Sequence, residues 1–295
     1  MNWTLWNKQK KYTHGFITLV GSALAFSLMT VCIKHLRGRI PVAELVFFRS
    51  VFSLLTTRLM MRNAGVYPWG INKRLLIARG LIGTSALFCV FKAIDSLPLG
   101  AATIIQYTYP TFIAFLAWLI LNEELRKRIF LAIILGWLGV QAVVHTLWEN
   151  SSHQQLAFPS VIVALSGAML TALAYVIVRK LSKQEHQLVI VFYFPLVSIP
   201  ITLPFLIHQS VLPIGTEWAW LIGIGIFTQL GQLLITNGLS LLPAGYAGSI
   251  SYTQVIFATL WGWLIFSEPL TFYILVGATC VLLATLISLS DLPNF

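Results

Sequence analysis

Residues 97–123, LPLGAATIIQYTYPTFIAFLAWLILNE, return 145 positions later as residues 242–268, LPAGYAGSISYTQVIFATLWGWLIFSE. The two stretches share 12 identical residues over 27 positions, where an apolar composition alone gives about three. The identical pairs include Leu97/Leu242, Pro98/Pro243, Gly100/Gly245, Tyr107/Tyr252, Thr108/Thr253 and Glu123/Glu268. The same offset joins Lys34 to Arg179 and Gly80 to Gly225. The chain is therefore two copies of one unit.

The composition is that of a polytopic membrane protein. Hydrophobic residues make up 58% of the chain and charged residues 9%, whereas soluble domains carry about 25% charged residues. Ten apolar segments approach the length of about 20 residues that crosses a bilayer. The predicted segments are 15–35, 41–62, 74–94, 99–121, 127–147, 158–179, 187–208, 217–240, 245–266 and 270–290.

These segments predict an all-α membrane protein with ten transmembrane helices. Helices satisfy their own backbone groups in lipid, and the sequence lacks the alternating pattern of a membrane barrel. Five crossings per copy is an odd number, so the second copy enters the membrane from the opposite face and the two five-helix repeats are inverted. We expect one membrane domain, with repeats at 13–147 and 158–290 and an external linker at 148–157.

The net charge of +10 follows the predicted topology. Of the 19 Lys and Arg residues, 13 lie at the ends predicted to be cytoplasmic, four lie at outer ends, and Arg49 and Arg79 lie inside spans. This bias is the positive-inside rule. It predicts a plasma or inner membrane protein with both termini in the cytoplasm, and it argues against nucleic-acid binding.

The chain carries no motif for catalysis, metal or cofactor. Cys32, Cys89 and Cys280 are single cysteines within spans, which indicates neither a metal site nor a disulfide framework. His-Glu-x-x-His and Gly-x-Ser-x-Gly motifs are absent from the sequence, which argues against an intramembrane enzyme. The basic residues before the first apolar segment resemble a signal peptide. However, the segment matches the equivalent segment 145 positions later, which we call its repeat mate, and this match predicts a retained helix.

Three stretches carry a family resemblance: residues 44–50 (ELVFFRS), residues 78–110 (from ARGLIG to TYP), and the acidic ends at 123–124 and 268–270. Over residues 13–290 the chain resembles the drug/metabolite transporter superfamily, and within it the ten-helix EamA-type carriers. The resemblance implies transport of a small organic solute through a central cavity that opens to one side at a time. A membrane protein of the same fold that binds a partner without transporting remains the alternative.

The expected partners are therefore a small organic solute and the lipid bilayer. The sequence indicates no oligomeric state, and a monomer is compatible with it. None of the nine acidic residues lies clearly at a midplane. Because proton-coupled carriers usually bury such a group, a facilitator or exchanger is favoured over a proton symporter.

Two arginines are the first candidates for solute binding. Arg49 lies about 12 Å from the outer end of its helix, at a rise of 1.5 Å per residue. A charge at that depth faces a cavity or a partner, so Arg49 either ties the structure to carbonyls or a carboxylate, or anchors an anionic solute with its planar fork. Arg79, about one turn from the cytoplasmic side, either extends to the interface or joins the same site.

Polar and aromatic residues on three other segments complete the prediction. Gln229 and Gln232 share one helix face and can bond a solute or a neighbouring helix. Tyrosines at repeat-mate positions can offer a ring and a hydroxyl, or pack the two halves together. The predicted substrate-binding residues are Arg49, Arg79, Gln106, Tyr107, Gln229, Gln232, Tyr252 and Gln254.

Two further features of the repeated segment carry predictions. Pro110 has Val255 as its mate, so we expect a helix interruption in the first half alone. Glu123 and Glu268 stand just before the following helices, and we expect them to cap those helices rather than take part in transport.

Overall fold

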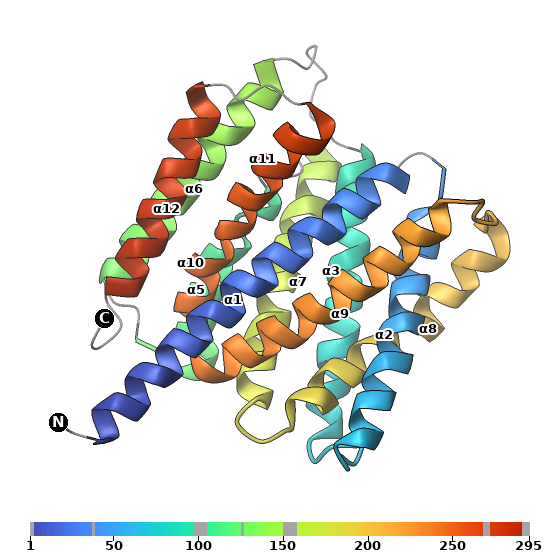
Figure 1. Cartoon of the computed structure of the whole chain (residues 1–295), viewed down its shortest axis with the longest axis horizontal. Coiled ribbons are helices and arrows are strands. Elements are labelled where there is room, and N and C mark those ends of the chain that lie inside the picture. Colours follow the sequence, from blue (N-terminus) through green and yellow to red (C-terminus); the bar gives the residue numbers. More distant parts are fainter. Residues whose placement is uncertain are drawn as a thin grey trace.

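The computed structural model describes residues 3–36, 39–96, 105–124, 127–149, 158–267 and 272–290, and every regular element in these ranges is a helix. Figure 1 shows them packed as one bundle. The helices are α1 (Trp3–Leu36), α2 (Val42–Asn63), α3 (Lys73–Ser96), α5 (Tyr109–Leu121), α6 (Lys127–Glu149), α7 (Phe158–Leu181), α8 (Gln187–Gln209), α9 (Glu217–Leu241), α10 (Ala244–Ser251), α11 (Thr253–Phe266) and α12 (Phe272–Ser290).

Nine of the predicted segments overlap a described helix, or the pair α10 and α11, over most of their length; the segment 99–121 is described from residue 105 and contains α5. Among the described residues, five spans are long and apolar enough to cross a membrane by length and composition, and they lie in α1, α7, α8, α9 and the α10–α11 pair. Helices α2 and α3 carry more charge, because Arg49 and Arg79 lie inside them. The all-helical fold class is confirmed. The largest difference is at α1, which begins at Trp3, well before the predicted apolar segment.

The two halves agree in where their helices begin and end. At the offset of 145, the matched boundaries are Leu36/Leu181, Val42/Gln187, Ser96/Leu241 and Leu121/Phe266. The agreement extends to rare backbone torsions. Asn122 and its mate Ser267 have φ of 53° and 51°, and Gly70 and its mate Gly215 have φ of 58° and 52°. The duplication therefore reaches the conformation of single residues.

Helix packing is unchanged when the halves are exchanged. Helix α1 packs on α9, as its mate α7 packs on α3, and α1 packs on α11, as α7 packs on α5. Helix α2 packs on its own mate α8, and α6 on its own mate α12; Figure 1 shows α6 and α12 side by side at one edge of the bundle. An approximate two-fold axis that passes between α2 and α8 and between α6 and α12 produces this pattern.

Two glycines show the same symmetry in close helix contacts. A Cβ at Gly80 of α3 would lie 2.7 Å from Val197 of α8, and a Cβ at Gly225 of α9 would lie 2.5 Å from Phe52 of α2. Gly80 and Gly225 are repeat mates, and so are Phe52 and Val197. Close helix approach needs a residue without a side chain, and the sequence supplies it at the same place twice.

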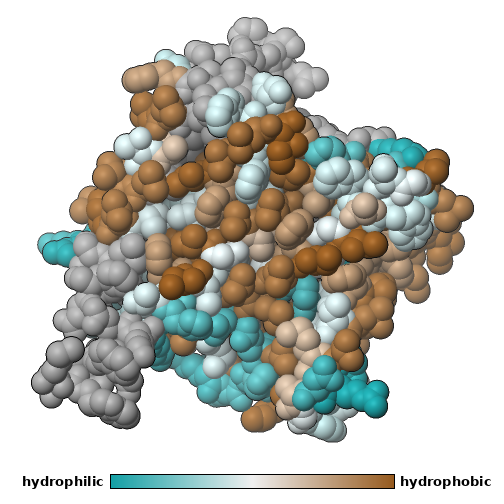
Figure 2. All heavy atoms as spheres, in the orientation of Figure 1, coloured by the Kyte–Doolittle hydropathy of each residue, from teal (hydrophilic) through white to brown (hydrophobic). Residues whose placement is uncertain are grey.

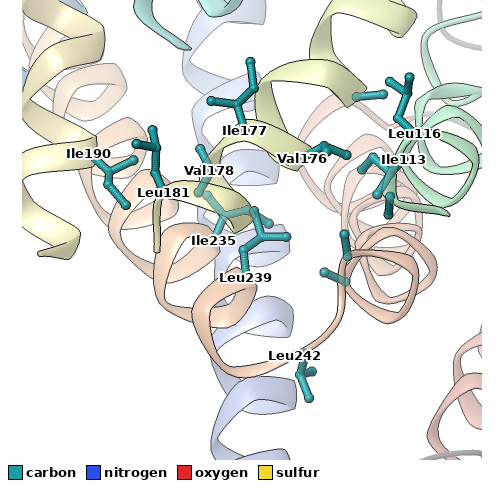
Figure 3. Packing of buried hydrophobic residues seen from close by; sticks show 14 of the residues in the cluster. Ile113, Leu116, Val176, Ile177, Val178, Leu181, Ile190, Ile235, Leu239 and Leu242 are labelled. Atoms are coloured by element: carbon teal, nitrogen blue, oxygen red, sulfur yellow. The ribbon is translucent and has the colours of Figure 1, made fainter. Parts of the chain in front are cut away.

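The buried core follows α7. Figure 3 shows Val176 of α7 beside Ile113 of α5, and Val178 and Leu181 of α7 beside Ile235 of α9, and all five side chains are buried. The outer surface is apolar as well. Figure 2 shows a broad hydrophobic face with hydrophilic residues gathered along its lower edge. A hydrophobic exterior with a polar edge suits a protein surrounded by lipid.

The expectation that the helix is interrupted in the first half alone is wrong. Helix α5 begins at Tyr109, and the second half breaks at Tyr252, between α10 and α11. A threonine stands at the same place beside both breaks. The Thr108 hydroxyl donates to the Ile105 carbonyl at 2.6 Å, and the Thr253 hydroxyl donates to the Ile250 carbonyl at 2.8 Å. A hydroxyl that bonds the preceding turn competes with the helix ladder and bends it.

Some predictions fall outside the described residues. These are the helix junction at 97–100, Glu268, and the linker at 148–157 beyond its first two residues. The division into repeats at 13–147 and 158–290 stays a prediction. The start of α1 and the end of α12 lie at the same end of the bundle, as do the connections at 64–72 and 182–186 (Figure 1).

Candidate functional site

Arg49 and Arg79 are both buried at the centre of the bundle. Arg49 is 4% exposed on α2 and Arg79 is 3% exposed on α3. Their guanidinium carbons lie 5.4 Å and 4.5 Å from the centroid of the Phe194 ring on α8. Phe194 is the repeat mate of Arg49. Two mates in contact must lie beside the axis that relates them, so this cluster lies at the approximate two-fold axis, where α2 packs on α8.

Arg79 faces the interior of the protein. Its Nη2 donates to Gln232 Oε1 at 3.1 Å, while Nε and Nη1 are buried without a hydrogen-bond partner among the described residues. Room for the guanidinium comes from Gly83, where a Cβ would lie 3.0 Å from Nη1. The alternative that Arg79 extends to the membrane interface is wrong, because this packing holds it inside.

Arg49 has no compensating polar contact within the described part of the chain. Its Nε is buried and unpartnered, and no hydrogen bond or ion pair reaches its other nitrogens. A charged arginine at the centre of a membrane helix costs at least about 2.5–3.5 kcal/mol, whereas a cation–π contact returns about 0.5–2 kcal/mol. The structural tie to a carbonyl or carboxylate is not seen here, and the deficit favours a ligand.

The described carboxylates that form hydrogen bonds are engaged at helix ends, away from the two arginines. Glu44 accepts from the Val211 amide at 2.9 Å, and Glu185 accepts from the Ile71 amide at 2.7 Å. Glu217 pairs with Arg39. The described residues contain no group of three His, Cys, Asp or Glu side chains that could hold a metal ion. The charge of the cluster is therefore uncompensated by the residues that the structure describes.

A run of tyrosines leads away from the arginines. Tyr175 of α7 interacts electrostatically with Arg49 and Arg79. Its ring centroid lies 5.9 Å from that of Tyr109, which lies 6.4 Å from that of Tyr107. These rings connect the charged centre to the helix break at Tyr107. Each tyrosine has a ring face for apolar groups and a hydroxyl for polar ones.

Gln229 and Tyr252, two of the remaining predicted residues, make close contacts with other helices. Gln229 accepts from Ser53 at 2.5 Å and donates to Thr57 at 2.8 Å, so its amide ties α9 to α2. Tyr252 is fully buried against α6, where a Cβ at Gly136 would meet its ring at 2.5 Å.

Neither Gln106 nor Gln254 forms a hydrogen bond within the described ranges, and both are partly buried. Their role in binding stays a prediction, as does that of Gln229 and Tyr252.

Two residues of the cluster were not predicted. Phe194 could have been found, because the offset of 145 assigns it to Arg49 and a central site contains mates. Pro195 follows it, and proline removes one bond of the α8 ladder there. Tyr175 has Thr30 as its mate and lies in an apolar run. Nothing in that pattern predicts a position near the arginines.

Glu123 and Arg179 form a second polar cluster at one end of the bundle. Glu123 Oε1 accepts from Arg179 Nε at 3.0 Å, and Oε2 accepts from the Ala244 amide at 2.7 Å. Arg179 Nη1 donates to the carbonyls of Leu239 and Ser240. Glu123 thus caps a helix, but the helix is α10 of the other half rather than α6. One ion pair joins the ends of α5, α7, α9 and α10.

With this geometry established, comparison with known proteins identifies the family. The EamA-like transporter family matches residues 13–144 and again residues 158–290. The chain belongs to this family. The resemblance to the drug/metabolite transporters is confirmed, and the protein is an integral membrane protein of a transporter family.

Individual relatives cover nearly the whole chain. The pseudopaline exporter CntI of Pseudomonas aeruginosa is 31% identical over 271 residues, which are 92% of this chain and 94% of that protein. Solute carrier family 35 member G1 of Homo sapiens is 28% identical over 90% of this chain and 76% of that protein. A solved crystal structure at 18% identity has a TM-score of 0.80, with 95% of this chain and 96% of that chain covered. It supports the fold.

Proposed function

We propose that the protein carries a small acidic organic solute across the membrane by alternating access between its two repeats. The observation that supports this most is the contact of Arg49 with its own mate, Phe194. Mates meet at the axis about which inverted repeats move, and transporters of this kind hold their solute there. Similarity to an exporter favours outward transport.

The residues have distinct parts in this proposal. Arg49 and Arg79 bind the acidic group of the solute, and the rings of Tyr175, Tyr109 and Tyr107 contact its remainder. A buried arginine makes charge-assisted and frequently bidentate bonds to carboxylate or phosphate, which are about twice as strong as neutral ones. The site thereby gains the negative charge that it lacks.

The Glu123–Arg179 pair is the proposed closure at one end. It joins α5 of the first half to three helices of the second. Its sequence mates, Glu268 and Lys34, belong to the opposite end of the bundle in an inverted repeat. In this proposal the Glu123–Arg179 pair breaks when this end of the protein opens.

The proposed orientation places both termini in the cytoplasm. It rests on the distribution of Lys and Arg along the chain. Reporter fusions after Lys183 and after Phe295 should both be cytoplasmic, and a fusion near Ser152 should be external. An external reporter after Phe295 would contradict the number of crossings.

Metabolite profiling tests the function. Cells that express the protein, cells that express Arg49→Gln at an equal membrane level, and cells with neither are compared. We expect one or more acidic metabolites to rise several-fold in the medium and fall inside cells with the unchanged protein alone. Identical profiles in all three would indicate a membrane protein of this fold that does not transport.

A further inference from the structure

We infer that the solute carries two negative charges, which Arg49 and Arg79 bind together. This deepens the proposed function and rests on it for transport, although binding can be measured without transport. Its substrate class is a short organic dianion, with two carboxylates or with one phosphoryl group.

The first argument is charge. Both guanidinium groups are at least nine-tenths buried, and they act on one another electrostatically as like charges. Neither has an ion pair with any residue that the structure describes, and Arg79 has one bond, to the neutral amide of Gln232. A single negative charge would leave one buried positive charge over. Two negative charges would leave none.

The second argument is the number of free donors. Arg49 Nε, Arg79 Nε and Arg79 Nη1 are buried with no partner in the described ranges. They come from two different helices, α2 and α3, and each guanidinium group can form its own bidentate pair with an acidic group. Two acidic groups, or the three oxygens of a phosphoryl group, can contact both guanidinium groups.

The third argument is size. The guanidinium carbons lie 5.4 Å and 4.5 Å from one ring centroid, so they are at most about 10 Å apart. A dicarboxylate with a chain of a few carbons spans such a distance. The Phe194 ring lies against both arginines and offers an apolar surface to that chain. The site therefore favours a compact organic dianion over a long one.

Thermal unfolding of the purified full-length protein in detergent tests this inference. The probes are succinate, glutarate and adipate, each compared with its own monoamide, and glycerol 3-phosphate, all at one ionic strength set with sodium chloride. We expect at least one dianion to raise Tm with a Kd at least ten-fold below that of the monoamides. Arg49→Gln and Arg79→Gln should each weaken that binding about 10- to 100-fold. Arg58→Gln, an exposed arginine on α2, should not.

Each outcome either supports or overturns the inference of two negative charges. Preference for glycerol 3-phosphate over the dicarboxylates, lost in both variants, supports the inference and identifies the acidic group as phosphoryl. Monoamides that bind as tightly as dianions, or no binding by any dianion, overturn it. If Arg49→Gln does not fold, Arg49→Lys keeps the charge without the fork and should weaken binding about ten-fold. Arginine-dependent binding without any transport in cells overturns the proposed function alone, and transport of a singly charged solute overturns the two-charge clamp alone.

Discussion

The two halves of this protein agree in their backbone and differ at the central site. Helix ends, left-handed residues and glycine contacts recur at an offset of 145. Tyr107 and Tyr252 recur as well, but the two arginines and Gln232 do not. Arg49 has Phe194 as its mate, Arg79 has Ile224, and Gln232 has Leu87. In the proposed function, the duplicated helices supply a scaffold with an axis, and residues that differ between the halves bind the solute. A solute with a charged part and an uncharged part requires such asymmetry.

The largest effect on transport should come from replacing Arg49 with phenylalanine, the residue at its mate position. Arg49→Phe removes a buried charge, so we expect transport to fall about 100-fold or more while stability holds or rises by about 1–4 kcal/mol. Efflux of the identified metabolite and Tm are measured together. The matched control is Arg58→Gln, which should leave both transport and Tm unchanged. Normal transport by a well-folded Arg49→Phe protein would remove Arg49 from the site.

The second effect concerns the closure at Glu123. Arg179 has Lys34 as its mate, so Arg179→Lys places a lysine at both of these equivalent positions. An ammonium group cannot hold the Glu123 carboxylate and two carbonyls in one plane. We expect Arg179→Lys to lower the free energy of unfolding by about 1–2 kcal/mol and Arg179→Gln by about 2–3 kcal/mol.

Thermal unfolding measures both variants, with Lys180→Gln as the exposed neighbouring control. The double variant Glu123→Gln/Arg179→Gln should lose less than the two single losses combined. Losses that add in full would show that the pair acts as two separate contacts.

The third prediction tests whether the two halves pack equivalently. Gly80→Ala and Gly225→Ala each force a Cβ into a helix contact closer than 2.8 Å. Overpacking of this kind costs about 1–3 kcal/mol, and mates should lose similar amounts. Gly245→Ala is the control, since its nearest atom would be 3.4 Å away. Tm values that fall for one mate and not for the other would contradict equivalent packing in the two halves.

The smallest effect concerns the paired left-handed residues. Ser267 and Asn122 both end a helix with positive φ, a conformation that glycine adopts freely and asparagine tolerates better than serine. Ser267→Gly should stabilise the protein by about 0.5–1 kcal/mol, and Asn122→Gly by less than about 0.5 kcal/mol. The difference between the two Tm increases is the measurement. Equal increases would mean that residue type does not matter at this position.

The sequence predicted the fold well because apolar length and internal repetition are direct records of helices in a membrane. It predicted Arg49, because a charge inside an apolar segment is conspicuous. It gave no account of Tyr175, because a tyrosine in an apolar run looks the same whether it faces lipid or a buried arginine. The break at Tyr252 was also missed, since the prediction relied on proline and the second half has Val255 at that position.

The most direct test of the account is the structure of the protein, determined by cryo-electron microscopy, with the metabolite identified by profiling bound. We expect the acidic groups of that metabolite to lie between the Arg49 and Arg79 guanidinium groups, with its carbon atoms against the Phe194 ring. A metabolite bound elsewhere, with both arginines paired to carboxylates of the protein, would contradict the account.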